Sequence, residues 1–167
     1  MGTKIISNTS HTIPRRSGLL QAQIDDTDNT RNKLSKPTVC PSCSAVFQEG
    51  RWQWLISQED SYQRICPACL RVQINCPAGY LTLNGGFFLA HRKEIMRLVH
   101  NYEEYERVEH PLTRIIKVIE EDKTTRVTTT DIHLARGIGR ALHHVYHGNL
   151  EFHYQAEENL LRIDWVR

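Results

Sequence analysis

Long apolar runs and a strong charge of one sign are both missing from this sequence. No stretch of the 167 residues approaches the roughly 18 consecutive apolar residues that a membrane-spanning helix needs. Residues 1–18 lack the apolar core of a signal peptide, so we expect a cytoplasmic protein without membrane contact. The formal net charge is only +2, which excludes a uniformly basic protein that coats nucleic acid but allows a local basic surface.

The short motifs of common catalytic sites are missing as well. The sequence has no GxxxxGK[ST] phosphate-binding loop, no GxSxG nucleophile elbow and no HExxH metalloprotease helix. The tripeptide Gly137-Ile138-Gly139 falls within a predicted helix, where it makes a poor nucleotide-binding loop. We therefore expect a protein that is not an enzyme, and the sequence identifies no small-molecule substrate.

Composition divides the chain into three zones. Residues 1–38 contain no Phe, Trp or Tyr, and six Lys and Arg outnumber three Asp, so we expect a disordered basic tail. Residues 39–87 contain all five cysteines and several glycines, which indicates a loop-rich metal-binding unit. Residues 88–167 alternate between helical and strand patterns.

The third zone predicts an α+β domain. Apolar spacing, β-branched segments and turn residues give the element order α-β-β-α-β-β. The predicted ranges are 88–108 and 132–147 for the helices and 113–120, 124–129, 150–154 and 160–166 for the strands. Thr130 or Asp131 would cap the second helix and Gly148 would end it. We expect an antiparallel sheet of about four strands with both helices on one face, and the cysteine unit packed on this domain.

The cysteines give the strongest pattern in the sequence. Cys40-Pro-Ser-Cys43 and Cys66-Pro-Ala-Cys69 are two CxxC pairs, and each can form a tight turn that directs both sulfurs at one ion. Two such knuckles close a tetrahedral Cys₄ site around Zn²⁺, with a strand pair between them over the metal. The sequence therefore predicts a zinc ribbon whose metal is structural, because four thiolates leave no open position.

Other features of the cysteine unit qualify this prediction. A dithiol redox pair is the alternative, but it needs one CxxC at the start of a helix and leaves the second pair unexplained. Cys76 has no CxxC partner, so we expect it to be half-buried and not a ligand. Ser44 and Leu70 stand where knuckles often have a glycine, which favours positive φ at that position.

The predicted helix 132–147 has a basic side. Basic residues recur there at steps of three and four, and no acidic residue follows Asp131 within the helix: His133, Arg136, Arg140, His143, His144 and His147. We predict that this side binds RNA phosphates, which favour protonated histidine; the alternative is a solvated polar face. Gly137 and Gly139 cost roughly 1 kcal/mol each against Ala in a helix, which indicates close approach by a strand or by RNA.

Two further arginines complete the predicted RNA-binding set, Arg51 and Arg71. Arg51 lies in the segment Gly50-Arg51-Trp52-Gln53-Trp54, and arginine beside aromatic rings is typical of nucleic-acid surfaces. For Trp52 and Trp54 themselves we favour packing against the α+β domain.

Several segments of residues 37–167 form a specific combination: CPSCSAVFQEGRWQW, CPACLRV, PAGYLTL, HRKEI, EHPLTRI, TTTDIHLARGIGRAL and YHGNLEFHY. With these segments, residues 37–167 resemble a family of short, poorly characterised bacterial proteins. Some members carry an ATPase label, which none of these residues supports. The layout is also similar, more weakly, to the zinc-binding N-terminal part of the archaeal and eukaryotic adaptor for large-ribosomal-subunit export, which has more cysteine pairs.

The resemblance implies contact with the ribosome or ribosomal RNA, under stress or in dormancy, as in ribosome hibernation. The alternative is a zinc-ribbon protein-interaction or transcription-regulatory module. In that case the acidic cluster of the first predicted helix, Glu103 to Glu109, would be the partner surface.

Overall fold

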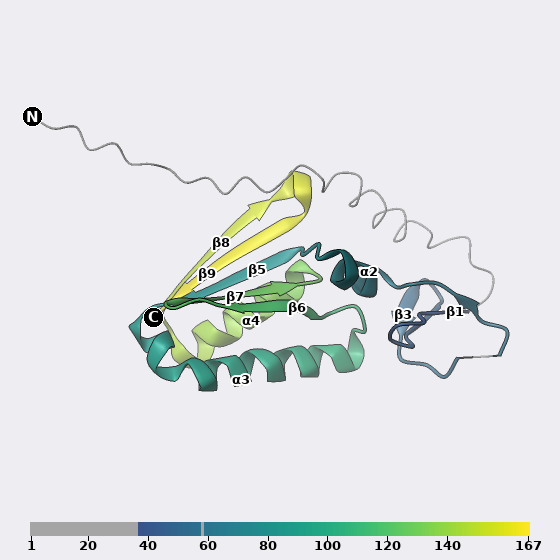
Figure 1. Cartoon of the computed structure of the whole chain (residues 1–167), viewed down its shortest axis with the longest axis horizontal. Coiled ribbons are helices and arrows are strands. Elements are labelled where there is room, and N and C mark those ends of the chain that lie inside the picture. Colours follow the sequence, from purple (N-terminus) through teal and green to yellow (C-terminus); the bar gives the residue numbers. More distant parts are fainter. Residues whose placement is uncertain (1–36, 58) are drawn as a thin grey trace, which may run out of the picture.

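The computed structural model describes residues 37–57 and 59–167. The tail predicted for residues 1–38 therefore lies outside the described residues, apart from Pro37 and Thr38. The described chain forms a small cysteine-containing unit at one end of the molecule and a larger α+β unit at the other (Figure 1).

A five-stranded sheet forms the centre of the α+β unit. Its strand order is β6-β7-β5-β9-β8, and Figure 1 shows helices α3 and α4 on the same face of the sheet. The helices are α3 (Gly86–Glu109) and α4 (Ile132–Tyr146); the strands are β5 (Gly79–Asn84), β6 (Ile115–Glu120), β7 (Thr124–Thr129), β8 (Asn149–Gln155) and β9 (Leu160–Val166), with a 3-10 turn η2 (Ala156–Glu158) between the last two.

Alternation along the strands places the core between the sheet and the two helices. Leu81 and Leu83 of β5 and Ile163 and Trp165 of β9 are fully buried on the helix side. The helices complete this core with apolar residues at steps of three and four, as an amphipathic helix requires: Phe88, Ile95, Met96 and Val99 of α3 and Leu134, Ala135, Ile138 and Leu142 of α4.

The α+β class is confirmed, but the sheet is mixed and not purely antiparallel. The central strand β5 is antiparallel to β7 and parallel to β9. Residues 79–84 fall in the range 39–87 predicted for the cysteine unit, whereas the structure places them in the larger sheet. Both partners of this strand lie far along the chain, so local pattern alone does not assign it to the sheet.

The cysteine unit contains a small sheet and a helix. Strands β1 (Thr38–Val39), β2 (Val46–Gln48), β3 (Arg51–Gln53) and β4 (Tyr62–Gln63) lie in the order β3-β2-β1-β4. The predicted strand pair between the CxxC motifs is the hairpin β2–β3. Its two-residue turn, Glu49-Gly50, has positive φ at both positions, as right-handed hairpin twist favours. Helix α2 (Pro67–Ile74) follows β4.

Candidate metal centre and basic surface

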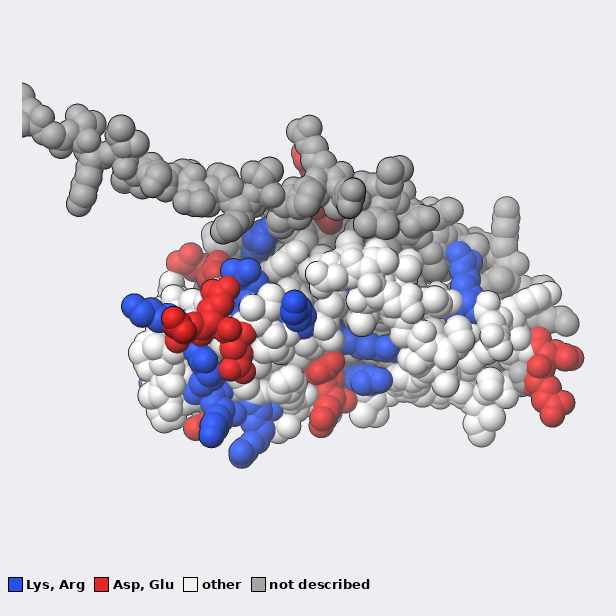
Figure 2. Space-filling model, in the orientation of Figure 1, with Lys and Arg blue, Asp and Glu red and all other residues white. Residues whose placement is uncertain are grey.

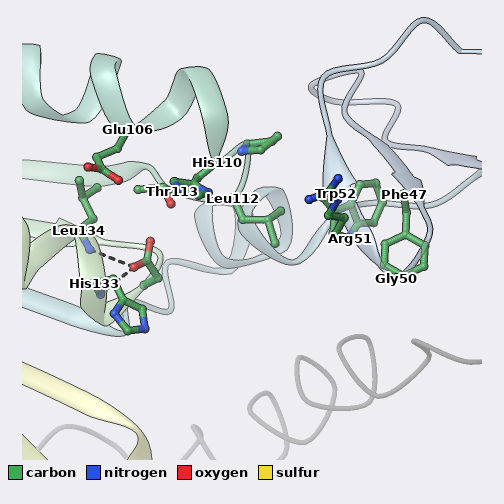
Figure 3. Close-up of a pocket in the computed structure, with 12 residues that line it drawn as sticks. Phe47, Gly50, Arg51, Trp52, Glu106, His110, Leu112, Thr113, His133 and Leu134 are labelled. Atoms are coloured by element: carbon green, nitrogen blue, oxygen red, sulfur yellow. Dashed lines mark hydrogen bonds between the residues drawn. The ribbon is translucent and has the colours of Figure 1, made fainter.

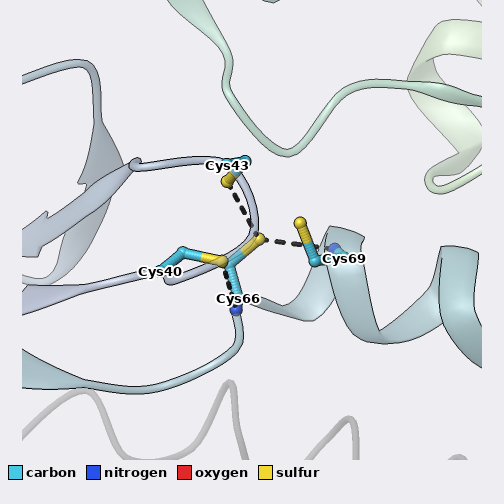
Figure 4. A group of neighbouring side chains, drawn as sticks. All are labelled: Cys40, Cys43, Cys66 and Cys69. Carbon is cyan, nitrogen blue, oxygen red and sulfur yellow. Dashed lines mark hydrogen bonds between the residues drawn. The ribbon is translucent and has the colours of Figure 1, made fainter.

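Four cysteine sulfurs converge in the cysteine unit. The Sγ atoms of Cys40, Cys43, Cys66 and Cys69 all lie within 4.8 Å of one another, and Figure 4 shows them directed toward a common point. Cys40, Cys66 and Cys69 are buried and Cys43 is half-buried. The residues predicted as metal ligands are thus brought together, and they form a group that can hold a metal ion.

The first CxxC pair forms the predicted tight turn. The Ser44 N–H donates to the Cys40 carbonyl and the Cys40 N–H to the Ala45 carbonyl, both at 2.8 Å. Ser44 has φ of 64°, so serine here adopts the left-handed conformation that glycine usually supplies.

The second CxxC pair differs from the prediction, because it starts a helix and does not form a second knuckle. Cys66 is the N-cap of α2, its sulfur accepts from the Cys69 N–H at 3.3 Å, and Pro67 lies in the first turn. Leu70 is therefore helical and needs no positive φ.

The distance between two of the sulfurs fits a tetrahedral tetrathiolate site. With zinc–sulfur bonds of about 2.3 Å, two sulfurs at tetrahedral positions lie about 3.8 Å apart. The Sγ atoms of Cys43 and Cys66 are separated by 3.8 Å. Backbone donors add support, since the Cys66 N–H donates to the Cys40 sulfur at 3.3 Å. The donor set is all sulfur, which favours a soft or borderline cation over Mg²⁺ or Ca²⁺.

The protein environment alone does not favour four thiolates. Burial raises the pKa of the Cys66 and Cys69 thiols above the usual range. Burial also raises the pKa of Cys40, but hydrogen bonds from backbone N–H groups, led by that of Cys66, outweigh it and lower the pKa to about 7. A divalent cation supplies the charge that lets all four sulfurs ionise together.

Arg114 brings a positive charge to the cysteines from the α+β unit. Its Nη1 donates to the Cys69 sulfur at 3.2 Å, and its Nη2 is buried without a hydrogen-bond partner. Leu112, from the same loop, packs against the buried cysteines together with Trp52 and Ile65. The four-cysteine site therefore lies at the junction of the two units.

Two observations bear on the redox alternative and on Cys76. The start of α2 at Cys66 is the placement that a redox CxxC requires, but a dithiol pair does not account for two further sulfurs within 4.8 Å. Cys76 is half-buried and lies outside the four-sulfur group, as predicted. Its carbonyl accepts a hydrogen bond from Arg71 Nη1 at 3.1 Å.

The basic side of α4 is largely exposed. Asp131 caps the helix as expected, since its Oδ1 accepts from the N–H groups of His133 and Leu134. Five of the six predicted residues are exposed and Arg136 is half-buried; the exposed ones are His133, Arg140, His143, His144 and His147. No acidic residue lies between Ile132 and Tyr146, so this side of the helix carries only basic and neutral groups.

The two arginines outside α4 have different environments. Arg51 is exposed on β3. Arg71 differs from the prediction: it is only 9% exposed and its guanidinium donates to the Cys76 carbonyl, so it belongs to the packing of α2 and not to the outer surface. The sequence alone does not indicate that this arginine is buried, because long arginine side chains usually keep their charged end in water.

The two tryptophans differ: Trp52 packs within the cysteine unit, whereas Trp54, although 40% exposed, contacts the α+β unit as expected. Trp52 lies against the cysteine cluster and Phe47, with ring centroids 5.5 Å apart. Trp54 Nε1 donates to the Arg107 carbonyl of α3 at 2.7 Å, which ties the cysteine unit to the end of this helix.

The two glycines of α4 permit close packing within the protein. A Cβ at Gly137 would clash with the Tyr102 ring of α3, and one at Gly139 would lie 3.2 Å from Ile163 of β9. Of the two neighbours considered from the sequence, strand or RNA, the sheet accounts for Gly139, whereas a side chain of α3 accounts for Gly137.

Comparisons of the chain with protein-family models, with curated proteins and with solved structures return no match. Within residues 37–57 and 59–167, none of the helices combines the length and apolar character needed to cross a bilayer.

Proposed function

We propose that this protein binds RNA and associates with the ribosome, with a structural Zn²⁺ in the four-cysteine site. The observation that carries the proposal is the exposed basic side of α4, formed by Arg140 and the histidines around it. Arginine and protonated histidine bind phosphate through charge-assisted hydrogen bonds, and phosphate in turn favours the protonated imidazole.

The charge distribution favours RNA binding by a local surface over binding by the whole protein. In the view of Figure 2, Lys and Arg lie interspersed with Asp and Glu over the α+β unit. With a net charge of +2, non-specific attraction by the whole protein is weak. Affinity for RNA would depend on α4, where basic groups line one side without acidic neighbours in the helix.

Exposed aromatic rings lie on the same side of the sheet as α4. Strand register pairs Phe152 with Ile163 and Tyr154 with Leu161. Cross-strand partners share a face, and both partners in β9 are buried under the helices, so the two rings of β8 project to the helix side. Phe152 is 43% and Tyr154 53% exposed. Rings beside a basic helix suit unstacked RNA bases.

Zinc is the metal we propose, because tetrahedral all-cysteine sites are typical of structural Zn²⁺. Cys40, Cys43, Cys66 and Cys69 would hold it and leave no position for a substrate or for water. Its role would be to fix the β2–β3 hairpin, which carries Arg51, against the α+β unit.

Sedimentation of cell lysate through a sucrose gradient tests the proposal. We expect the protein to migrate with ribosomal subunits or ribosomes at low salt and to dissociate at high salt, because phosphate contacts release counterions when they form. Comparing growing with starved cells tests the proposed role in stress or dormancy, which predicts a larger bound fraction after starvation. Migration as free protein under all conditions would contradict ribosome association.

A protein-interaction or transcription-regulatory module is the second candidate, and one feature of α3 favours it. Tyr105 and Val108 are 76% and 71% exposed near the end of this helix, beside the exposed carboxylates of Glu104 and Glu109. Apolar side chains rimmed by charge are typical of protein-binding surfaces. Migration of the protein with RNA polymerase in the gradient would favour this candidate.

A further inference from the structure

A cavity of about 530 Å³ lies between the cysteine unit and the α+β unit. Its walls come from the β2–β3 hairpin, from the end of α3 with the loop that follows it, and from the start of α4 (Figure 3). Binding sites for small organic molecules span roughly 300–1,000 Å³, so one nucleotide fits this space. Arg51 and His133, two predicted RNA-binding residues that lie far apart in the sequence, both line this cavity.

The two ends of the cavity differ in charge. Figure 3 shows Arg51 and Trp52 at one end, with His110 facing them, and Glu106 and His133 at the other. Glu106 is half-buried and belongs to α3, whereas Arg51 is exposed on β3. Asp131 lines the same acidic end, where one carboxylate oxygen caps α4 and the other is buried without a hydrogen-bond partner. A ligand that matches this polarity carries an anion at one end and N–H donors at the other.

We propose that the cavity binds a single guanine nucleotide, presented as an unstacked residue of the RNA that lies along α4. Guanine has two adjacent N–H donors, N1–H and the N2 amino group, which a carboxylate such as Glu106 accepts side by side. The phosphate lies toward Arg51, and Trp52 and His110 offer ring faces to the sugar-base body. Adenine and cytosine offer one amino group beside a ring acceptor, and uracil flanks its N–H with carbonyls, so a carboxylate disfavours all three.

The proposal rests on RNA binding for its biological ligand, but a mononucleotide tests the cavity separately. Guanosine 5′-monophosphate is titrated into the full zinc-loaded chain and followed by tryptophan fluorescence and calorimetry, with AMP, CMP and UMP alongside. We expect saturable binding with a preference for GMP. Glu106→Gln should weaken GMP binding roughly tenfold or more and abolish the preference, because a charged acceptor is removed. Arg51→Gln should weaken the binding of every nucleotide that the parent protein binds.

Matched control variants distinguish the loss of a cavity residue from a general change in the charge of the protein. Glu109→Gln alters an exposed carboxylate on the same helix, and Arg126→Gln alters an exposed arginine on β7; neither residue lines the cavity. Both should bind GMP as the parent does. No saturable GMP binding, equal affinity for the four nucleotides, or an unchanged Glu106→Gln variant would overturn the proposal.

Measuring the binding of a 12-nucleotide oligouridine to the same protein distinguishes the proposed RNA binding along α4 from the proposed guanine site. Salt-sensitive binding of oligouridine without GMP binding leaves RNA binding intact and removes the guanine site. A second oligomer carries one guanosine at the centre of the oligouridine. If the protein binds GMP but neither oligomer, the cavity remains a mononucleotide site and RNA binding along α4 is contradicted.

Discussion

Arg114 Nη1 donates to the sulfur of Cys69 across 3.2 Å, and this bond joins the four-cysteine site to the α+β unit. The rest of Arg114 is fixed by the same unit: Nε donates to the Pro111 carbonyl and the backbone N–H to Thr130 Oγ1. A Zn²⁺ ion bound by the four thiolates would carry a net charge of −2, and the half-buried Arg114 guanidinium beside one sulfur would offset part of that charge. Thr130 directly precedes the cap of α4, which links the metal centre to the proposed RNA surface.

Replacing Arg114 with Leu should therefore loosen the metal. Partners that donate to metal ligands commonly contribute about 10–100-fold to metal affinity. We expect Arg114→Leu to lower zinc affinity by at least about tenfold, measured by competition with a chromogenic chelator. Arg126→Leu is the matched control, since Arg126 is exposed on β7 and should leave affinity unchanged. Equal affinities for the two variants would show that the Arg114–Cys69 bond does not support the metal.

Metal content tests the ligand set itself. We expect about one zinc per chain and loss of that zinc, with reduced solubility, in Cys40→Ser and in Cys66→Ser. Structural Zn²⁺ can contribute on the order of 10 kcal/mol to a small unit, so the cysteine unit should unfold without it. Cys76→Ser should keep the metal, because Cys76 lies outside the four-sulfur group. A metal-free Cys76→Ser variant beside a zinc-loaded Cys40→Ser variant would contradict this ligand set.

The features that sequence predicts well depend on local pattern. The four cysteines have a fixed spacing, and Ile132–Tyr146 repeats apolar and basic residues at helical steps behind an Asp cap, so both are found without tertiary information. The strand Thr124–Thr129 is located to the residue for the same reason, because β-branched residues fill it between clear turns.

The features that sequence misses depend on interactions between distant segments. Arg114 gives no signal as a neighbour of the cysteines, because only the fold brings it to Cys69, 45 residues earlier. Arg71 resembles a surface residue, since burial of a guanidinium requires a carbonyl partner that sequence does not reveal. The exposure of Phe152 is equally hidden, because it depends on how far α4 extends over β8.

Gly137 should resist substitution by alanine. Alanine in a helix gains up to about 1 kcal/mol over glycine, but here the added Cβ would clash with the Tyr102 ring, and overpacking typically costs about 1–3 kcal/mol. We expect Gly137→Ala to lower the free energy of unfolding, measured by denaturant titration. Gly86→Ala is the control: it lies in the first turn of α3 with nothing near its added Cβ, and should be neutral or stabilising. A Gly137→Ala variant as stable as the Gly86→Ala control would mean that α3 and α4 pack less closely than described.

The basic side of α4 provides the most direct test of RNA binding. Replacing both Arg136 and Arg140 with Glu removes two positive charges and adds two negative ones on one side of the helix. We expect ribosome or RNA binding to weaken by about tenfold or more at low salt. The dependence of log affinity on log salt concentration should also become shallower by about one for each arginine–phosphate pair removed. Lys117→Glu with Arg126→Glu makes the same charge change on exposed positions of β6 and β7, and should have little effect.

The competing explanation for these residues predicts a different outcome. If Arg136 and Arg140 mainly held α4 in place, the Glu variant would unfold at lower temperature and the near-UV signal of its tryptophans would change. Exposed positions away from caps and core usually change stability by less than about 0.5 kcal/mol, so Arg140 should tolerate the change, and half-buried Arg136 is the more sensitive of the two. A variant that folds like the parent and binds ribosomes equally well would exclude this side of α4 and leave Arg51 as the remaining exposed arginine of the predicted set.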